Sequence, residues 1–577
     1  MQYPGIGQAT EDGNRMDAFV QEPHQLAQVP PPSPQADRLL DYRLDDNLTA
    51  QSGRILISGT QALVRLPLMQ ARLDRQSGWT TAGFVTGYRG SPLGAVDQAL
   101  WKAQALLDAH QVRFMPAINE ELGAAAALGT QRVASDAQRR VEGVFALWYG
   151  KGPGVDRAGD TLRHGNAYGS SQRGGVLVVA GDDHGCVSSG IPFQSDLAMQ
   201  AWSMPVLHPA NVAEIIEFGL YGWALSRFSG AWSGLIALSE TVEGTATVDL
   251  DSLRTRFDEP VAFNPPAGGL HYRMNDLPGL GIEARLSAKL DAVRVFAYAN
   301  PIDRLIVPAP KASVGIVTCG KAHLDLLEAL RRLDISLEAL ADAGVRVYKV
   351  GLVYPLEPQR MLEFVSGLDE VLVVEEKGAV VETQLRALLY NCPAGQRPRV
   401  LGKHDQHGAP MLSALGELRP SRVMPVLAQW LAGHFPSLDR RDSVPTFVAL
   451  AMLSNASDAV QRMPYFCAGC PHNMSTRVPL DSDASGGIGC HAMVGWMDRS
   501  NTFPQVPMGS GLAGACGQQL GLSRWRGLPR PADGKRPHSR SLCPRGRGQR
   551  LDCRSTNHGS QTKGTQKNHR VPLQRAL

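Results

Sequence analysis

Three cysteines in the C-terminal third of the chain have the spacing of a metal site. Cys467 and Cys470 are separated by two residues in Cys-Ala-Gly-Cys-Pro-His, and Cys490 follows 20 positions after Cys470. Two thiolates at this separation reach one metal from a single turn. The spacing fits zinc, with His472 or His491 as a fourth ligand, and fits an iron–sulfur cluster equally well. A redox-active pair is a third alternative, although no thioredoxin-like context surrounds it.

A second arrangement combines a glycine-rich turn with an acidic residue. The turn Gly-Tyr-Arg-Gly-Ser-Pro, residues 87–92, follows an apolar run, and its glycines allow close approach of the backbone to a ligand. Glu120 stands about thirty residues later, where a predicted strand meets a helix of small residues. A buried carboxylate in such a place can hydrogen-bond the aminopyrimidine ring of a thiamine cofactor and promote ionisation of thiazolium C2. The spacing alone favours a simpler interpretation, an acid that stabilises a helix N-terminus.

The segment Gly-Lys-Gly-Pro-Gly, residues 150–154, combines glycines with a lysine, as phosphate-binding loops do. It lacks the Gly-x4-Gly-Lys-Ser/Thr spacing with which a P-loop surrounds phosphates. We therefore do not predict a nucleotide-binding P-loop here.

Alternating strands and helices must position these residues. The strands are apolar runs without polar alternation, which is typical of strands covered on both faces and predicts a mostly parallel sheet. In such sheets, ligand loops lie at the strand ends, where this sequence has its glycine-rich turns. The first predicted strands are 55–59, 84–90, 144–150, 176–185 and 234–240, with helices at 96–109 and 212–225.

A second strand–helix series follows a charged helical stretch, with predicted strands at 313–323, 345–356 and 370–377. The length of 577 residues suits about three or four domains. The predicted organisation is a disordered leader (1–45), a first α/β domain (46–265), a helical linker (266–310), a second α/β domain (311–400), a connector (401–462), the start of a third domain (463–515) and a basic tail of low order (516–577).

Composition is that of an ordinary water-soluble α/β protein, with 43% apolar, 19% charged and 6% aromatic residues. We predict no membrane span, because no run of about 18 apolar residues occurs. The N-terminus lacks the basic-then-apolar layout of a signal peptide. Nine scattered cysteines do not form a disulfide framework, so we expect a reducing, cytoplasmic location.

The net charge of +4 comes from the last part of the chain. Residues 521–577 carry 14 Lys and Arg but two acids, Asp533 and Asp552, whereas the rest of the chain has an excess of acids. This segment has no hydrophobic period and is too polar to bury a core. It is either a disordered basic tail or a frameshifted or truncated end. We expect the second, because the third domain stops too soon, and we predict no nucleic-acid partner.

Two blocks of sequence resemble the indolepyruvate ferredoxin oxidoreductase family in its long fused bacterial form. The first joins the 87–92 turn and Asn-Glu at 119–120 to Gly-Pro-Gly-Val-Asp-Arg, Arg-His-Gly-Asn and Gly-Asp-Asp-His within 150–196. The second is Cys-Ala-Gly-Cys-Pro-His with Gly-Gly-Ile-Gly-Cys within 463–495, where the family has proline in place of Ala468. The order of these motifs makes the resemblance specific.

The resemblance implies an α/β, multidomain fold with thiamine-diphosphate-binding-type parallel-sheet domains plus a transketolase C-terminal-like α/β domain. Residues 46–265 would bind the pyrimidine, 311–400 would be the transketolase C-terminal-like domain, and 463–515 would begin the diphosphate-binding domain. The second of these is mainly structural in the family. We assign no catalysis to Glu375 or Glu376, because an acid pair after a strand is more often a cap.

The resemblance also assigns roles to single residues. Glu120 becomes the catalytic acid that activates the pyrimidine, and Cys467, Cys470 and Cys490 fit three ligands of a [4Fe–4S] cluster. The fourth cluster ligand is not assigned. Further cofactor-binding candidates are Gly87, Tyr88, Gly90, Ser91, Pro92, Asn119, His472 and Gly489, and candidates for the substrate or interdomain side are His164, Asn166, Asp182, Asp183 and His184.

The implied reaction is oxidative decarboxylation of an aryl or branched-chain 2-oxoacid, indolepyruvate-like, to an acyl-coenzyme A. Thiamine diphosphate, Mg²⁺ and the [4Fe–4S] cluster are the implied cofactors, coenzyme A and ferredoxin the implied partners, and the full-length form is expected to be a homo-oligomer. The family's Gly-Asp-Gly…Asn segment for magnesium and diphosphate is not found after Cys490, so we expect no turnover by this chain alone. The alternatives are a non-oxidative thiamine-dependent decarboxylase or synthase, and a non-catalytic remnant with a zinc-binding cysteine knob.

Overall fold

The computed structural model describes most of residues 42–444 and a few short segments beyond them. The described ranges are 42–187, 189, 191–261, 263–274, 276, 279–444, 465–477, 484–485, 493–494, 497 and 502–503. The chain divides into two compact units, residues 1–457 and 458–577. The predicted basic tail, nearly all of the predicted leader, and Gly489 and Cys490 lie outside the described residues, so those predictions remain predictions.

The larger sheet of the first unit has seven strands in the order β12-β6-β7-β5-β4-β2-β3. Its neighbouring strands are parallel, except that β12 runs antiparallel to β6. The central strand β5 is buried along its whole length, as expected for a strand covered on both faces. The strands are β2 (Thr81–Gly87), β3 (Val112–Pro116), β4 (Gly143–Lys151), β5 (Val176–Asp182), β6 (Val206–Leu207), β7 (Ser233–Leu238) and β12 (Leu352–Tyr354).

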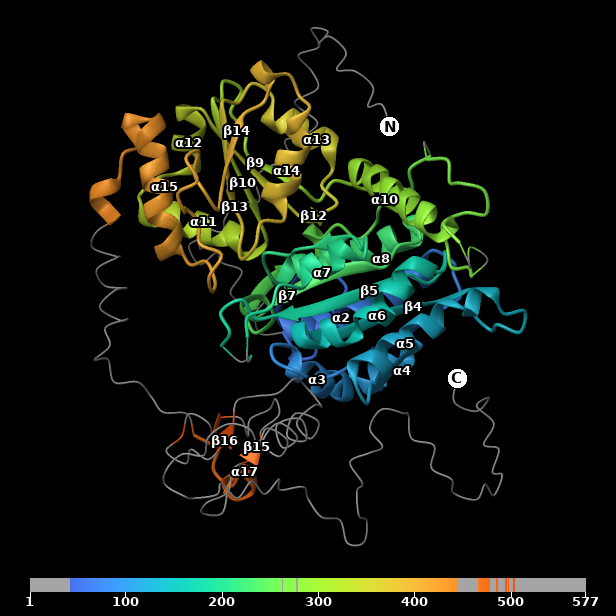
Figure 1. Cartoon of the computed structure of the whole chain (residues 1–577). Helices are drawn as coiled ribbons and strands as arrows, with labels where there is room; N and C mark the ends of the chain where they lie inside the picture. Colours follow the sequence, from blue (N-terminus) through green and yellow to red (C-terminus); the bar gives the residue numbers. More distant parts are fainter. Residues whose placement is uncertain are drawn as a thin grey trace, which may run out of the picture. The chain divides into compact units, whose positions relative to one another are not determined.

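Helices pack on both faces of this sheet (Figure 1). One face is covered by α2, α3, α4, α8 and α10, and the other by α5, α6 and α7. The predicted α/β class with mostly parallel strands is confirmed. The helices are α2 (Gly59–Gln76), α3 (Val96–Lys102), α4 (Gln104–Ala109), α5 (Glu120–Gln131), α6 (Gly152–Tyr168), α7 (Ser195–Ala201), α8 (Val212–Ser229) and α10 (Gly281–Ala299).

The smaller sheet has five strands in the order β14-β13-β10-β11-β9, and only β9 is antiparallel to its neighbour. Helices α13 and α14 share one hydrophobic cluster with α5, α6 and α7 of the larger sheet, so the two sheets have a common core. Helices α11, α12 and α15 cover the other face. The elements are β9 (Arg304–Val307), β10 (Val314–Cys319), α11 (Gly320–Arg332), α12 (Leu337–Ala343), β11 (Val345–Val350), α13 (Pro358–Val365), β13 (Glu370–Val374), α14 (Val381–Tyr390), β14 (Arg399–Leu401) and α15 (Pro420–His434).

The predicted strand 55–59 does not belong to the larger sheet. It forms β1 (Arg54–Ser58), which pairs antiparallel with β8 (Thr245–Asp249) in a separate two-stranded sheet. Burial alternates along β1, with Ile55 and Ile57 buried and Leu56 exposed, so its apolar run covers one face only.

The predicted strand 345–356 is divided between the two sheets, β11 in the smaller and β12 in the larger. The carboxylate of Asp303 accepts hydrogen bonds from the backbone N–H of Gly351 at 2.7 Å and of Leu352 at 3.2 Å, and so takes the chain out of the β11 ladder. The predicted helix 96–109 is also interrupted, because α3 ends before Ala103 and α4 begins after it.

The described part of the second unit contains α17 (His472–Ser475) and the short pair β15 (Ala484–Ser485) and β16 (Thr502–Phe503). In the parts of both units that the structure describes, no helix is long and apolar enough to cross a membrane.

Candidate active site

The carboxyl ends of the central parallel strands meet at one edge of the seven-stranded sheet. Strands β2, β3, β4 and β5 end here at Gly87, Pro116, Lys151 and Asp182. This is the edge at which parallel α/β sheets bind ligands. It brings together the candidates Gly87, Tyr88, Gly90, Ser91, Pro92, Asn119, Glu120, Asp182, Asp183 and His184.

Glu120 is the first residue of α5 and is 1% exposed. Its Oε2 has no hydrogen-bond partner among the residues that the structure describes. The indole Nε1 of Trp148 donates to the Glu120 carbonyl at 3.0 Å, and the Asn119 side chain caps α5 by accepting from Leu122 N–H at 2.8 Å. A buried carboxylate oxygen without a donor is costly, so this arrangement fits a ligand that donates a hydrogen bond.

The first turn of α6 touches the Glu120 side chain. A Cβ atom added to Gly154 would lie 2.5 Å from Glu120 Cγ and 2.7 Å from Oε1. Only glycine therefore lets α6 approach this carboxylate without displacing it.

The turn after β2 packs against the end of β4. Tyr88 N–H donates to the Tyr149 carbonyl at 3.1 Å, and a Cβ at Gly87 would lie 2.2 Å from that same oxygen. A Cβ at Gly90 would lie 3.0 Å from Cδ of the buried Lys151. The glycines of this turn therefore allow close packing on β4.

The last residue of β5 and the first residue of the loop after it are buried acids. Asp182 accepts from the backbone N–H of Ser195 at 2.7 Å and from its hydroxyl at 2.6 Å, while Asp183 accepts from Val187 N–H at 2.9 Å. Burial raises the pKa of Asp182, although His184 and the bonds from Ser195 oppose that rise. Burial also lowers the pKa of Lys151, and the charge of Asp183 opposes this.

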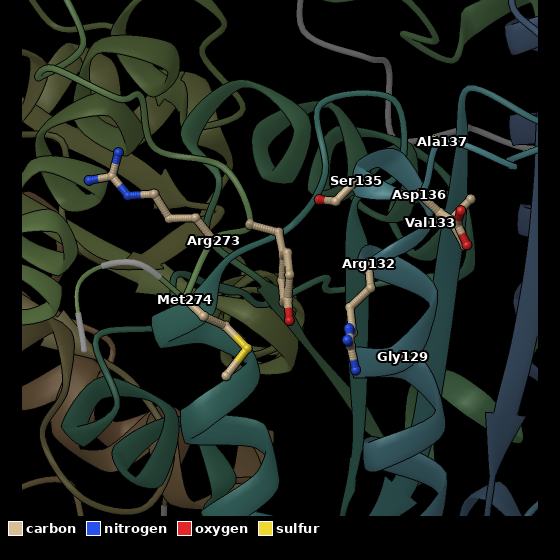
Figure 2. Close-up of a pocket in the computed structure, with 9 residues that line it drawn as sticks. Gly129, Arg132, Val133, Ser135, Asp136, Ala137, Arg273 and Met274 are labelled. Carbon is tan, nitrogen blue, oxygen red and sulfur yellow. The ribbon is translucent and has the colours of Figure 1, made fainter. Parts of the chain in front are cut away.

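A groove of about 740 Å³ lies at the far end of α5 from Glu120 (Figure 2). Figure 2 shows Arg132 on one side of it and Arg273 and Met274 on another. The groove carries both charges, because Asp136 lines it together with the two arginines. It is not part of the carboxyl edge, and none of the predicted site residues lines it.

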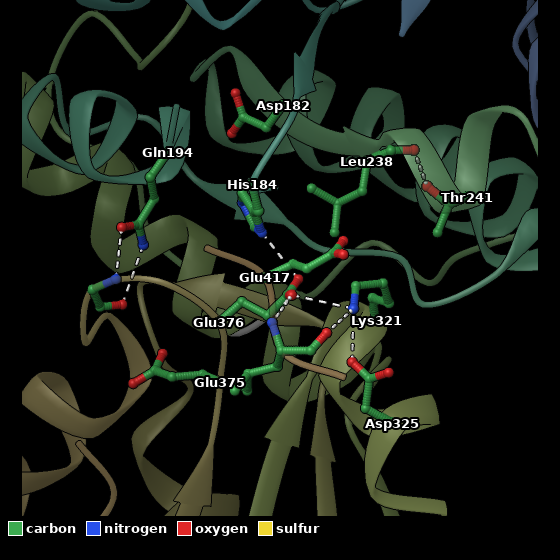
Figure 3. A network of polar contacts seen from close by, with 12 residues as sticks. Asp182, His184, Gln194, Leu238, Thr241, Lys321, Asp325, Glu375, Glu376 and Glu417 are labelled. Carbon is green, nitrogen blue, oxygen red and sulfur yellow. Dashed lines mark hydrogen bonds and ion pairs between the residues drawn. The ribbon is translucent and has the colours of Figure 1, made fainter. Parts of the chain in front are cut away.

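His184 forms a buried ion pair with Glu376, which follows β13 of the smaller sheet (Figure 3). Nδ1 of His184 donates to Glu376 Oε2 at 2.9 Å. Burial lowers the pKa of His184, but the hydrogen bond and charge of Glu376 outweigh it, and the net change is a raised pKa. Burial opposes ionisation of Glu376 as well, yet His184 and Lys321 hold its pKa at about 2. Each partner therefore favours the charged form of the other.

The interpretation of the Glu375–Glu376 pair as caps is right for one residue and wrong for the other. Glu375 accepts hydrogen bonds from the backbone N–H groups of Val380, Val381 and Glu382 at the start of α14. Glu376 instead connects the smaller sheet to the larger one. Sequence reasoning missed this pairing, because no local signal says which of two adjacent acids faces another sheet.

His164 and Asn166 lie elsewhere. They belong to α6, which begins at the carboxyl edge, and twelve residues of helix place His164 about 18 Å away from the start. The exposed His164 contacts its own helix through the Asp160 carbonyl at 2.8 Å. Asn166 donates to the Trp202 carbonyl at 2.8 Å and accepts from Trp232 N–H at 2.9 Å. The structure does not bring these two candidates to the edge.

In the second unit, Cys467 and Cys470 lie in one tight turn. Cys470 N–H donates to the Cys467 carbonyl at 3.0 Å, and Gly469 between them has a φ of 75°. Both thiols are free, and the half-buried His472 begins α17. Within the described ranges, no group of three or more metal-ligating side chains is assembled. The third predicted ligand, Cys490, falls outside these ranges.

Comparison with known proteins gives a consistent result. The family model "Indolepyruvate oxidoreductase domain" matches residues 304–445, the stretch that contains the five-stranded sheet and α15. The indolepyruvate oxidoreductase subunit IorA of Methanothermobacter thermautotrophicus is 25% identical over 490 residues, which are 82% of this chain and 70% of the relative. The subunit IorA of Methanothermobacter marburgensis is 25% identical over 83% of this chain and 71% of its own length.

The chain is related to the indolepyruvate oxidoreductases along about four fifths of its length. These relatives are named as subunits of an oxidoreductase, which supports an oxidoreductase role for this chain. A solved 2-oxoglutarate:ferredoxin oxidoreductase from Magnetococcus marinus, with 2-oxoglutarate, coenzyme A and succinyl-CoA bound, is 15% identical over 66% of this chain and 65% of its own. The TM-score of this match is 0.47.

Proposed function

We propose that this family member takes part in thiamine-diphosphate-dependent oxidative decarboxylation of an indolepyruvate-like 2-oxoacid, and that the carboxyl edge of its seven-stranded sheet binds the pyrimidine. The observation that carries the proposal is the carboxylate of Glu120, which is buried and has one oxygen without a described partner. The names of the relatives support the choice of an indolepyruvate-like substrate.

The residues present fit an aminopyrimidine ring. A protonated ring nitrogen is a donor, and Oε2 of Glu120 is an acceptor that lacks one. The hydroxyl of Thr86, at the end of β2, is a second buried polar group without a described partner. The glycines of the 87–92 turn hold this turn closely against β4 at the same edge.

When bound, thiamine diphosphate supplies the nucleophilic carbon that a 2-oxoacid requires in order to lose CO2. Glu120 would hold the pyrimidine through Oε2 and exchange a proton with it there. Trp148 and Asn119 keep the start of α5 in place, so the carboxylate does not have to reorganise. Glu120 is itself buried, which keeps water away from its carboxylate.

Electron transfer belongs to the same proposal. Cys467, Cys470 and Cys490 would hold a [4Fe–4S] cluster, which would supply electron transfer to ferredoxin, and coenzyme A would be the acyl acceptor. The spacing of the three cysteines and the family resemblance support this part. Mg²⁺, the fourth cluster ligand, homo-oligomer formation and the cytoplasmic location stay predictions. So does the absence of turnover by the chain alone, which indolepyruvate-dependent reduction of a viologen dye would contradict.

Titration calorimetry with thiamine and with thiamine diphosphate tests the pyrimidine site. Glu120→Gln should weaken the binding of both by about 10- to 100-fold, since a hydrogen bond to a charged group is worth about 1.5–3 kcal/mol. The matched control is Glu121→Gln, because Glu121 is the exposed neighbour on the same helix. Equal affinity in both variants, or no binding by the unmodified chain, would contradict the proposal.

A further inference from the structure

The ion pair between His184 and Glu376 joins two loops that follow strands of different sheets. His184 stands two residues beyond the end of β5, and Glu376 two residues beyond the end of β13. Their side chains are 5% and 2% exposed. A charged pair this deeply buried costs desolvation energy, and packing alone does not require it.

The two loops have a second, uncharged connection. Gly378 N–H donates to Gln194 Oε1 at 2.8 Å, and Gln194 Nε2 donates to the Gly378 carbonyl at 3.2 Å (Figure 3). These two uncharged hydrogen bonds already hold the loops together. The charged pair of His184 and Glu376 is therefore not needed to join these two loops.

Glu376 is itself fixed from the side away from His184. Its Oε1 accepts from the Leu418 N–H at 2.8 Å and lies 3.2 Å from Nζ of Lys321. Lys321 in turn bonds Asp325 at 2.7 Å. Oε1 is thus held by the smaller sheet and its connections, and Oε2 is left to orient the imidazole ring.

The surroundings of His184 favour its charged form. Besides Glu376, the acids Asp182 at the end of β5 and Asp196 in α7 raise its pKa. His208, which follows β6, remains neutral, because burial and the nearby His184 lower its pKa to about 3. With Nδ1 bound to Glu376, the imidazolium carries its second proton on Nε2.

We propose that Glu376 is a positioning residue, which fixes the orientation and the positive charge of His184 so that Nε2 serves as a hydrogen-bond donor to the 2-oxoacid at the carboxyl edge. The inference rests on the proposed function for its substrate. Because Glu376 follows a strand of the smaller sheet, this sheet would contribute to the reaction as well as to the structure. An imidazolium is suited to the anionic carboxylate or the carbonyl oxygen of a 2-oxoacid.

Histidine NMR tests the positioning without any turnover. The chain is labelled at histidine Cε1, the His184 signal is assigned by its loss in His184→Gln, and its titration is followed in the full chain. In Glu376→Gln the midpoint should fall by about 1–3 pH units, the usual effect of an opposite charge at contact distance. Glu338→Gln, which changes an exposed acid of the same unit, should leave the midpoint unchanged.

A second variant separates electrostatics from loss of structure. Lys321→Met removes the competing cation from Glu376, so the His184 midpoint should rise, opposite in direction to Glu376→Gln. If the His184 midpoint moves in the same direction in both variants, or in neither, the positioning role is wrong. If Glu376→Gln fails to fold, Lys321→Met decides alone, and a midpoint that does not rise in it contradicts the role.

Addition of indolepyruvate tests the substrate contact on the same spectra. A shift of the His184 signal that is lost in Glu376→Gln supports the proposal. If the titrations behave as expected but indolepyruvate shifts no histidine signal, the proposed donor role is wrong. In that case the proposed function is judged by thiamine binding alone. Binding that is weakened in Glu120→Gln would support it, and no binding would count against it.

Discussion

At the scale of single residues, the carboxylate of Glu120 depends on a neighbour that has no side chain. Gly154→Ala would place a methyl group 2.5 Å from Glu120 Cγ, so the acid must move away from its present position. We expect thiamine affinity to fall by about tenfold or more while the chain stays folded. Calorimetry on this variant checks the effect, with Gly129→Ala as control, because a Cβ at Gly129 meets nothing within 4 Å.

The pair of His184 and Glu376 predicts a pH dependence of stability. The folded pKa of His184 is raised above its ordinary value of 6.5, so its contribution is complete below pH 6.5 and is lost as the pH rises through the raised pKa. The folded pKa of Glu376 is about 2, below its ordinary 4.5, so its contribution is complete above pH 4.5 and is lost as the pH falls toward 2.

Urea unfolding of the unmodified chain and of Glu376→Gln measures this dependence. The difference in unfolding free energy should be greatest between pH 4.5 and 6.5, where loss of one partner of a buried pair costs about 3–5 kcal/mol. It should shrink well above neutrality. A difference that stays constant from pH 5 to 9 would show that the ion pair is not its source.

Some residues of the candidate site could be predicted from the sequence and others could not. Glu120 could be named because its motif resembles that of a family, although the spacing alone favoured a helix-stabilising acid. In the structure Glu120 is the first residue of α5, so both interpretations describe the same residue. The role of Gly154 and the pairing of Glu376 with His184 depend on the packing of segments far apart in the chain. No local pattern contains that information.

At the scale of elements, α5 positions Glu120 through its N-cap. Asn119→Ala removes the acceptor for Leu122 N–H and should lower the unfolding free energy by about 1 kcal/mol. Asn119→Asp should keep most of the stability, since aspartate caps helices as well as asparagine does. Chemical denaturation of the two variants decides whether the cap stabilises this helix, and equal losses would argue against it.

The strands of the larger sheet were predictable to the extent that they are buried on both sides. Strands β4, β5 and β7 are continuous apolar runs, and the sequence shows them plainly. Strand β3 was missed because it is an edge strand with alternating burial, and β12 because its three residues adjoin β11 in the sequence. Edge and boundary strands take their identity from their neighbours in space.

At the scale of the whole molecule, the metal content distinguishes the proposed function from its alternatives. Anaerobically purified protein should be brown and contain iron and sulfide, and both should fall strongly in Cys467→Ser. Elemental analysis checks this, with Cys392→Ser as control, because Cys392 lies in the first unit. Zinc in place of iron would favour the non-catalytic remnant, and a colourless, metal-free enzyme would favour a non-oxidative thiamine enzyme.

The α/β class of the described residues and the relation to indolepyruvate oxidoreductases could be predicted from apolar runs and two blocks of motifs. The common core of the two sheets could not, because the residues that build it, such as Met199 of α7 and Phe364 of α13, lie on elements far apart in the sequence. The candidate site is a similar case. The sequence identified one edge of one sheet, and the contribution of the second sheet became visible only in the packed structure.

Exchange of the C2 proton of thiamine diphosphate for deuterium tests the central claim, that Glu120 activates the cofactor, most directly. Proton NMR would follow the exchange in the presence of the unmodified chain and of Glu120→Gln, each at a concentration that saturates the cofactor. We expect acceleration by about 10²–10⁴-fold over the free cofactor with the unmodified chain, and loss of this acceleration in Glu120→Gln. Equal acceleration by both proteins, or none by the unmodified chain, would contradict it.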